Sequence, residues 1–230
     1  MDEAVTNAFE DFHREYKRQM SIFRPCRPGG EIVEANLVSN FISSWKNVNS
    51  PKFNAVEVPF AVSGFNSINL QDIYDYVGKH PWRNHLDGLI LEGGTLYLIE
   101  AKRDANPSQL IKNISADLER IHSLELAASL NAMLFREAYN KKHEDRFCIK
   151  HVVGIILADT WRPSIKRAWK RGQFSNPKIQ KNFECSMLKT MEREVVDLQV
   201  KPDKSNESYC LLLGVTRPIS SSLEVINGII

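Results

Sequence analysis

A pair of glycines between two apolar runs constrains the fold of this 230-residue chain more than any other feature. The segment "HLDGLILEGGTLYLIEAKR", residues 85–103, has residues suited to a pleated surface on both sides of Gly93 and Gly94. Glycine readily adopts the positive φ angles that a two-residue hairpin turn requires. The segment therefore predicts a β-hairpin in which each residue before the turn has a defined partner after it.

The predicted hairpin brings ionisable residues together at the end away from the turn. Asp87 lies opposite Glu100, and His85 lies opposite Lys102, on a face that is apolar near the turn. Opposed Cβ atoms are roughly 4.5 to 5.5 Å apart, so two carboxylates there repel each other and require a cation. A hard ion such as Mg²⁺ fits, because it needs only one or two protein carboxylates. Lys102 supplies part of the compensation and can also orient or activate an attacking water.

The rest of the chain predicts an α/β protein in one domain, residues 1–230, with a central mixed sheet, flanking helices and an added N-terminal helix. We divide the domain into an N-terminal helix in 1–24 that packs on the rest or extends from it, an expected catalytic core in 31–135, and a remaining sheet with a basic helix in 150–230. Helices are expected at 1–20, 31–45, 70–78, 106–121, 125–139 and 162–172, and strands near 55–62, 151–159, 194–200 and 209–216.

The acidic residue before the turn and the Glu-x-Lys after it resemble a known nuclease signature. PD-(D/E)XK, or restriction-endonuclease-like, nucleases have an acidic residue on one hairpin strand, Glu-x-Lys on the next and a helix after it. Asp87 and "EAK", Glu100 to Lys102, are similar to that pattern, although Leu86 stands where the named pattern has proline. The resemblance covers about residues 31–124. It implies a restriction-endonuclease-like core and a metal-dependent nuclease that hydrolyses phosphodiester bonds. DNA is the expected substrate, and an endonuclease is the expected type of enzyme.

The same resemblance implies a role for each residue of the site. Asp87, Glu100 and the backbone carbonyl of Ala101 would bind Mg²⁺ or Mn²⁺. Glu34 would support the ion directly or through water. Lys102 would act on the water nucleophile.

Four further assignments have alternatives at this stage. Glu34 shares a helix face with apolar residues, which favours a supporting role, but a helix-borne Glu is also commonly solvated; Glu31 is the second candidate. Gln109 resembles a glutamine that some members of the superfamily place near the site. His85 can approach a substrate or serve as a structural histidine.

A basic segment follows the strand expected at 151–159. From Thr160 to Phe183 the chain contains no Asp or Glu. The basic residues chosen as nucleic-acid-binding candidates are Lys166, Arg167, Lys170 and Arg171. They can neutralise phosphates, although the same residues also suit a solvated helix face.

Composition limits the environment and the cofactors. The four cysteines are far apart and form neither a CxxC motif nor a Cys/His cluster, so no zinc site or disulfide framework is indicated. No apolar run is long enough to span a bilayer, and the expectation is a cytoplasmic protein without a membrane partner.

Two other functions compete with the nuclease. One is a nucleic-acid-binding member of the same fold whose site no longer binds metal. The other is an interaction module in which the N-terminal helix presents Phe9 and Phe12 to a protein partner or a second copy in a homodimer. The residues leave open DNA or RNA as substrate, endonucleolytic or exonucleolytic cutting, sequence preference, oligomeric state and biological pathway.

Overall fold

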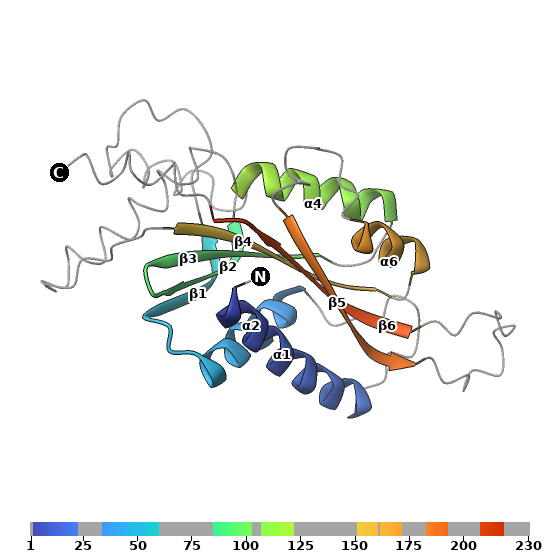
Figure 1. Cartoon of the computed structure of the whole chain (residues 1–230), viewed down its shortest axis with the longest axis horizontal. Coiled ribbons are helices and arrows are strands. Elements are labelled where there is room, and N and C mark those ends of the chain that lie inside the picture. The colour runs from blue at the N-terminus through green and yellow to red at the C-terminus, as the bar shows by residue number, and fades with distance from the viewer. Residues whose placement is uncertain are drawn as a thin grey trace, which may run out of the picture.

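The protein is an α/β structure in which helices cover both faces of one mixed sheet (Figure 1). The computed structural model describes residues 2–22, 34–59, 85–102, 107–121, 151–160, 162–171, 183–192 and 208–218. The elements are α1 (Glu3–Ile22), α2 (Glu34–Val48), β1 (Phe53–Pro59), β2 (His85–Glu92), β3 (Thr95–Lys102), α4 (Pro107–Ile121), β4 (His151–Thr160), α6 (Pro163–Lys170), β5 (Phe183–Glu192) and β6 (Ser208–Thr216). The expected α/β class is confirmed at this level. The helices expected at 70–78 and 125–139 and the strand at 194–200 lie outside the described residues.

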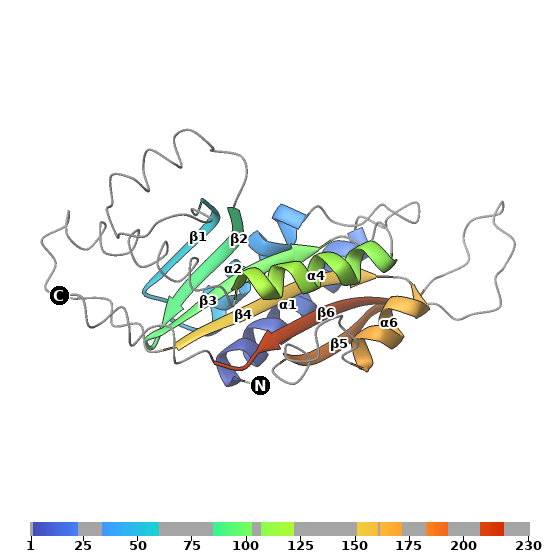
Figure 2. The ribbon, with the colours of Figure 1, turned by 90° about the horizontal axis from the view of Figure 1, so that it is seen from above.

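The strand order of the sheet is β1-β2-β3-β4-β6-β5. Strands β3 and β4 are parallel, in register from Thr95 with His151 to Lys102 with Ala158, and the other neighbours are antiparallel. The carboxyl ends of β3 and β4 therefore lie side by side. Helix α6 starts directly after β4, so it begins at the sheet edge where Lys102 ends β3 (Figure 2).

The hairpin of β2 and β3 has the predicted turn and register near the turn. Gly93 and Gly94 have φ angles of 57° and 82°, and the paired residues run from Glu92 with Thr95 to Gly88 with Ile99. The two glycines therefore provide the positive φ angles that the turn needs.

The expected pairing of Asp87 with Glu100 is not formed, because the β2–β3 ladder ends at Gly88 and Ile99. Instead, the Asp87 carboxylate accepts a hydrogen bond from the backbone N–H of Ala101 at 2.6 Å. A side-chain acceptor has replaced the main-chain acceptor of the partner strand at the point where the ladder stops. The extrapolation failed because it assumed continuous backbone pairing up to the polar end.

Alternate residues of each strand contribute to two separate cores. On one face, Tyr97 and Ile99 of β3 pack with α1 and α2 in an aromatic cluster that includes Phe12 and Trp45. On the other face, strand residues pack with α4 and α6; the buried members from β3 and these helices are Leu96, Leu98, Leu110, Ile114, Leu118, Ile121, Ile165 and Trp169. Because residues two apart share a face, Glu100 and Lys102 extend the α4/α6 face.

Helix α1 uses its aromatic residues inside the chain. Phe9 is 2% exposed and Phe12 is fully buried, and the Phe12 ring makes edge contacts with Tyr16 and Phe41. The chain itself therefore covers these two phenylalanines, whereas a partner at other residues of α1 stays a prediction. Amphipathic spacing identifies a buried face but does not tell whether the same chain or another covers it. Within the described residues, no helix is long and apolar enough to cross a membrane.

Candidate active site

The polar end of β3 places a carboxylate and an ammonium next to each other on the α4/α6 face. The Glu100 side chain is 1% exposed and the Lys102 side chain 16% exposed. Lys102 Nζ lies 3.4 Å from Glu100 Oε2. A buried carboxylate is costly unless it is hydrogen-bonded or near positive charge, so this strand end requires compensation from its surroundings.

A second carboxylate, which the sequence reasoning missed, reaches the same ammonium from α4. Asp117 Oδ2 lies 2.9 Å from Lys102 Nζ, and the Asp117 side chain is 9% exposed. Asp117 shares the buried face of α4, three residues after Ile114 and four before Ile121. The sequence does contain a signal for Asp117, because this carboxylate lies on the apolar face of the helix that follows Glu-x-Lys.

Asp87 joins the group from β2 through the main chain of β3. Its hydrogen bond to the Ala101 N–H places its carboxylate next to the peptide unit that follows Glu100. Asp87 also acts on the charge of Lys102 through space. We call Asp87, Glu100, Lys102 and Asp117 the acid–lysine cluster; it joins three consecutive elements, β2, β3 and α4.

The electrostatics of the cluster keep Lys102 charged. Burial by itself would lower the pKa of the Lys102 amine, but the charges of Asp117 and Glu100, the contact with Asp117 and the more distant Asp87 outweigh it. The pKa of Lys102 is therefore raised above its ordinary value. At neutral pH the side chain is an ammonium, which can donate hydrogen bonds but cannot accept a proton.

The cluster has more acidic than basic groups, which is the condition that favours a bound cation. Among the described side chains of the cluster, Glu100 and Asp117 lie within ion-pair distance of Lys102 and Asp87 lies farther away, so the cluster itself contains three acids and one base. Within the described residues, no three His, Cys, Asp or Glu side chains are close enough to form a metal-binding group. A Mg²⁺ ion needs only one or two protein carboxylates and keeps several waters, so the expectation of a bound metal stays a prediction here.

The other candidate residues are placed less directly. Glu34 is the first residue of α2 and its side chain is outside the described atoms, as is the whole of Glu31. A Cβ on Gly88 would meet Val38 of α2 at 2.7 Å, which puts the N-terminal half of α2 near the polar end of β2. This helix nevertheless packs on the α1/α2 face, opposite to Lys102.

Neither His85 nor Gln109 makes a described contact with the acid–lysine cluster. His85 begins β2, half-buried, and is in register with Pro59 of β1 rather than with Lys102. Gln109 is exposed and donates a hydrogen bond to Asn113 at 2.6 Å along the surface of α4.

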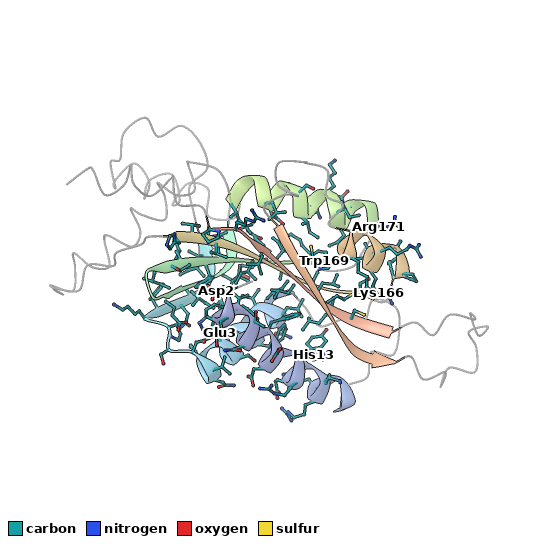
Figure 3. The ribbon with its side chains drawn as sticks, in the orientation of Figure 1. Asp2, Glu3, His13, Lys166, Trp169 and Arg171 are labelled. Atoms are coloured by element: carbon teal, nitrogen blue, oxygen red, sulfur yellow. The ribbon has the colours of Figure 1, made fainter. Side chains whose placement is uncertain are left out.

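Helix α6 presents the predicted basic residues at the same end of the sheet. Ile165 and Trp169 are buried, and the Trp169 indole N–H donates to the Leu213 carbonyl at 3.3 Å. This fixes the helix so that Arg167, Lys170 and Arg171 are exposed and Lys166 is half-buried; Figure 3 marks Lys166, Trp169 and Arg171. The described part of α6 contains no acidic residue in its first turn.

Comparisons of the chain with protein-family models, with curated proteins and with solved structures find no match in any of the three.

Proposed function

We propose that this protein is a metal-dependent nuclease that hydrolyses phosphodiester bonds in nucleic acid, with DNA as the first substrate to test. The observation that carries the proposal is the acid–lysine cluster, in which Glu100, 1% exposed, is buried beside a charged lysine and two further acids. Enzymes keep such costly arrangements where the charges perform chemistry. The order α2, β1, β2, β3, α4, β4 supports a restriction-endonuclease-like core, the finer fold implied by the resemblance.

The ligands proposed for Mg²⁺ or Mn²⁺ are Asp87, Glu100 and the carbonyl of Ala101, with Glu34 as a supporting carboxylate. A bound divalent ion would polarise the phosphodiester and lower the pKa of a coordinated water. The hydrogen bond from the Ala101 N–H to Asp87 supports this set, because the N–H and C=O of one strand residue point to the same side, so Asp87 lies on the side of the proposed Ala101 carbonyl ligand.

Lys102 acts as a hydrogen-bond donor rather than as a general base. Its raised pKa keeps the ammonium charged at neutral pH, so it would orient the attacking water or a phosphate oxygen and stabilise negative charge that develops on the phosphate. Without a bound metal, the raised pKa favours orienting the water over activating it, the two roles that the sequence allowed. The proton lost by the attacking water must go to another acceptor.

The basic residues of α6 are proposed to bind the phosphates that flank the scissile bond. The helix begins at the carboxyl end of β4, beside the carboxyl end of β3, so its charges lie at the same end of the sheet as Lys102. Such contacts position nucleic acid without reading its sequence.

A cleavage assay on single-stranded and double-stranded DNA and RNA, with Mg²⁺ or Mn²⁺, tests the proposal. We expect the parent chain to cleave at least one substrate, and Asp87→Ala and Lys102→Ala to lose that activity. Glu15→Ala, which alters the other Glu-x-Lys copy on α1, is the matched control and should cleave like the parent. Cleavage that survives Asp87→Ala or Lys102→Ala contradicts the mechanism.

A second candidate is a nucleic-acid-binding protein of the same fold that does not cut. The observation in its favour is that the described residues contain no group of three metal-ligating side chains. Calorimetric titration with Mn²⁺ alone separates the two functions. Binding that disappears in Glu100→Ala supports the enzyme, whereas nucleic-acid binding that needs no metal and no Glu100 supports the alternative.

A further inference from the structure

The Lys102 ammonium lies between carboxylates from two different elements. It is 2.9 Å from Asp117 of α4 and 3.4 Å from Glu100 of its own strand. The ammonium donates a hydrogen bond to Glu100 Oε2, but at 3.4 Å it is longer than charged pairs usually are, whereas the 2.9 Å ion-pair separation from Asp117 Oδ2 is within the usual range. The ammonium is therefore bound more closely to the helix than to β3.

Strand β3 alone does not fix where this ammonium lies. Glu100 and Lys102 are two residues apart on one face, so their side chains stand next to each other, and lysine has a flexible four-carbon stem. Without a second partner, Glu100 would be the nearest carboxylate to Lys102 in the cluster. A close pair between them would occupy the carboxylate that the proposed metal site needs.

Asp117 is well placed to limit that pairing to the long 3.4 Å contact that is formed. Its neighbours Ile114 and Leu118 are both fully buried, so this turn of α4 is packed tightly against the sheet. A side chain on a packed helix holds its partner in a more defined position than a side chain on a loop. The Asp117 carboxylate is itself almost buried, which makes its contact with the ammonium a strong constraint.

We propose that Asp117 is a positioning residue, which holds the Lys102 ammonium on the α4 side of the cluster and so keeps Glu100 available for catalysis. The catalytic consequence rests on the nuclease function proposed above. The contact between Asp117 and Lys102 is a property of the folded chain and can be tested without any activity.

The first test is ¹⁵N NMR of lysine ammonium groups in the full chain without metal, near neutral pH. A slowly exchanging signal, assigned by its absence in Lys102→Met, is expected in the parent protein. It should shift or disappear in Asp117→Asn, remain in Asp117→Glu, and be unaffected in Asp11→Asn, where a half-buried aspartate pairs with Arg14 on α1. Asp117→Ser replaces Asp117→Asn if the latter fails to fold. An unchanged Lys102 signal in the folded variant overturns the proposal.

The second test is steady-state cleavage together with Mn²⁺ binding. Residues that orient a catalytic group cost roughly 10- to 100-fold when they are changed. Asp117→Asn is expected to lose kcat in that range with an unchanged KM, to bind Mn²⁺ more weakly, and to be largely rescued in Asp117→Glu. Parental kcat in Asp117→Asn overturns the positioning role. If the parent chain cleaves nothing, the nuclease proposal fails while the NMR result still decides whether Asp117 holds Lys102.

Discussion

Among the described contacts, a fully buried carboxylate on the α1/α2 face of the sheet accepts from a neutral hydroxyl, whereas two buried carboxylates on the α4/α6 face lie against one lysine. Asp159 of β4 is 0% exposed and accepts a hydrogen bond from the Tyr16 hydroxyl at 2.6 Å. Glu100 and Asp117 are also buried, yet both lie against Lys102. One sheet therefore buries acids in two different ways on its two faces.

The surroundings explain the difference. Around Tyr16, the rings of Phe12, Phe41 and Trp45 form a chain of edge contacts with centroid separations of 5.6 to 5.9 Å, which makes this face an aromatic core. The α4/α6 face is apolar along most of its length and becomes charged only at the strand ends. Proteins accept unfavourable local charge mainly at functional sites. We infer that the first face provides stability and the second provides chemistry.

The largest expected effect that separates the faces is on stability. Phe12→Ala removes a fully buried ring from α1 and should lower the free energy of unfolding by about 3 to 5 kcal/mol. Urea denaturation followed by circular dichroism measures this. Cleavage per folded molecule should be unchanged, and the control Val56→Ala, at a residue 48% exposed, should cost far less. A loss of cleavage in folded Phe12→Ala protein would break the division between the faces.

The next effect concerns the buried acid of the α1/α2 face. Tyr16→Phe removes the hydroxyl that donates to Asp159 and should destabilise the protein by about 1 to 3 kcal/mol, because a buried carboxylate loses a hydrogen bond. The cost should be smaller in an Asp159→Asn background, which denaturant titrations of the four variants can show. Mn²⁺ binding should not change; weaker binding would mean that the two faces are coupled.

The hairpin explains how much the sequence could predict. Its turn, its strands and its register near Gly93 follow from local rules, because glycine conformations and alternating apolar residues act over a few neighbours. The end of the ladder at Gly88 could not be foreseen in this way, since it depends on the Asp87 side chain that replaces a backbone acceptor. Local pattern predicts pairing, but side-chain competition for the same N–H groups decides where it stops.

The site shows the same limit over longer distances. Glu100 and Lys102 were predictable, because both lie in one strand at a fixed spacing. Asp117 was missed because its role depends on how α4 packs across β3, which no spacing within the helix specifies. Burial of Phe9 agrees with the expected packing of the N-terminal helix on the domain, but amphipathic spacing by itself left a partner at Phe9 open because it does not identify the surface that covers the residue.

A smaller effect is expected from removing one charge of the cluster. Glu100→Gln keeps the shape of the side chain but relieves repulsion among the acids, while Asp117 still pairs with Lys102. Stability should stay the same or rise by up to about 1 kcal/mol, as is common when a functional residue is replaced. Denaturant titration should show an equally small change in the free energy of unfolding for Glu15→Gln, which replaces a surface carboxylate that pairs with Arg18. A large loss of stability would show that Glu100 is structural, like Asp159.

The smallest effect is a pH dependence from the α1/α2 face. Burial of the Tyr97 ring, together with its hydrogen bond to Asp2, raises the pKa of its hydroxyl above the ordinary value of 10.0. Below pH 10 the Tyr97 hydroxyl is protonated in both the folded and the unfolded chain, so its full contribution to the free energy of unfolding is present. Above pH 10 the hydroxyl ionises first in the unfolded chain, so this contribution falls as the pH rises. Lys102 gives a decline of the same sign, because its pKa is also raised. The difference between Tyr97→Phe and the parent in urea unfolding at increasing pH therefore isolates Tyr97. We expect a shallower decline in the variant, and equal slopes would show that the hydroxyl is not protected by the fold.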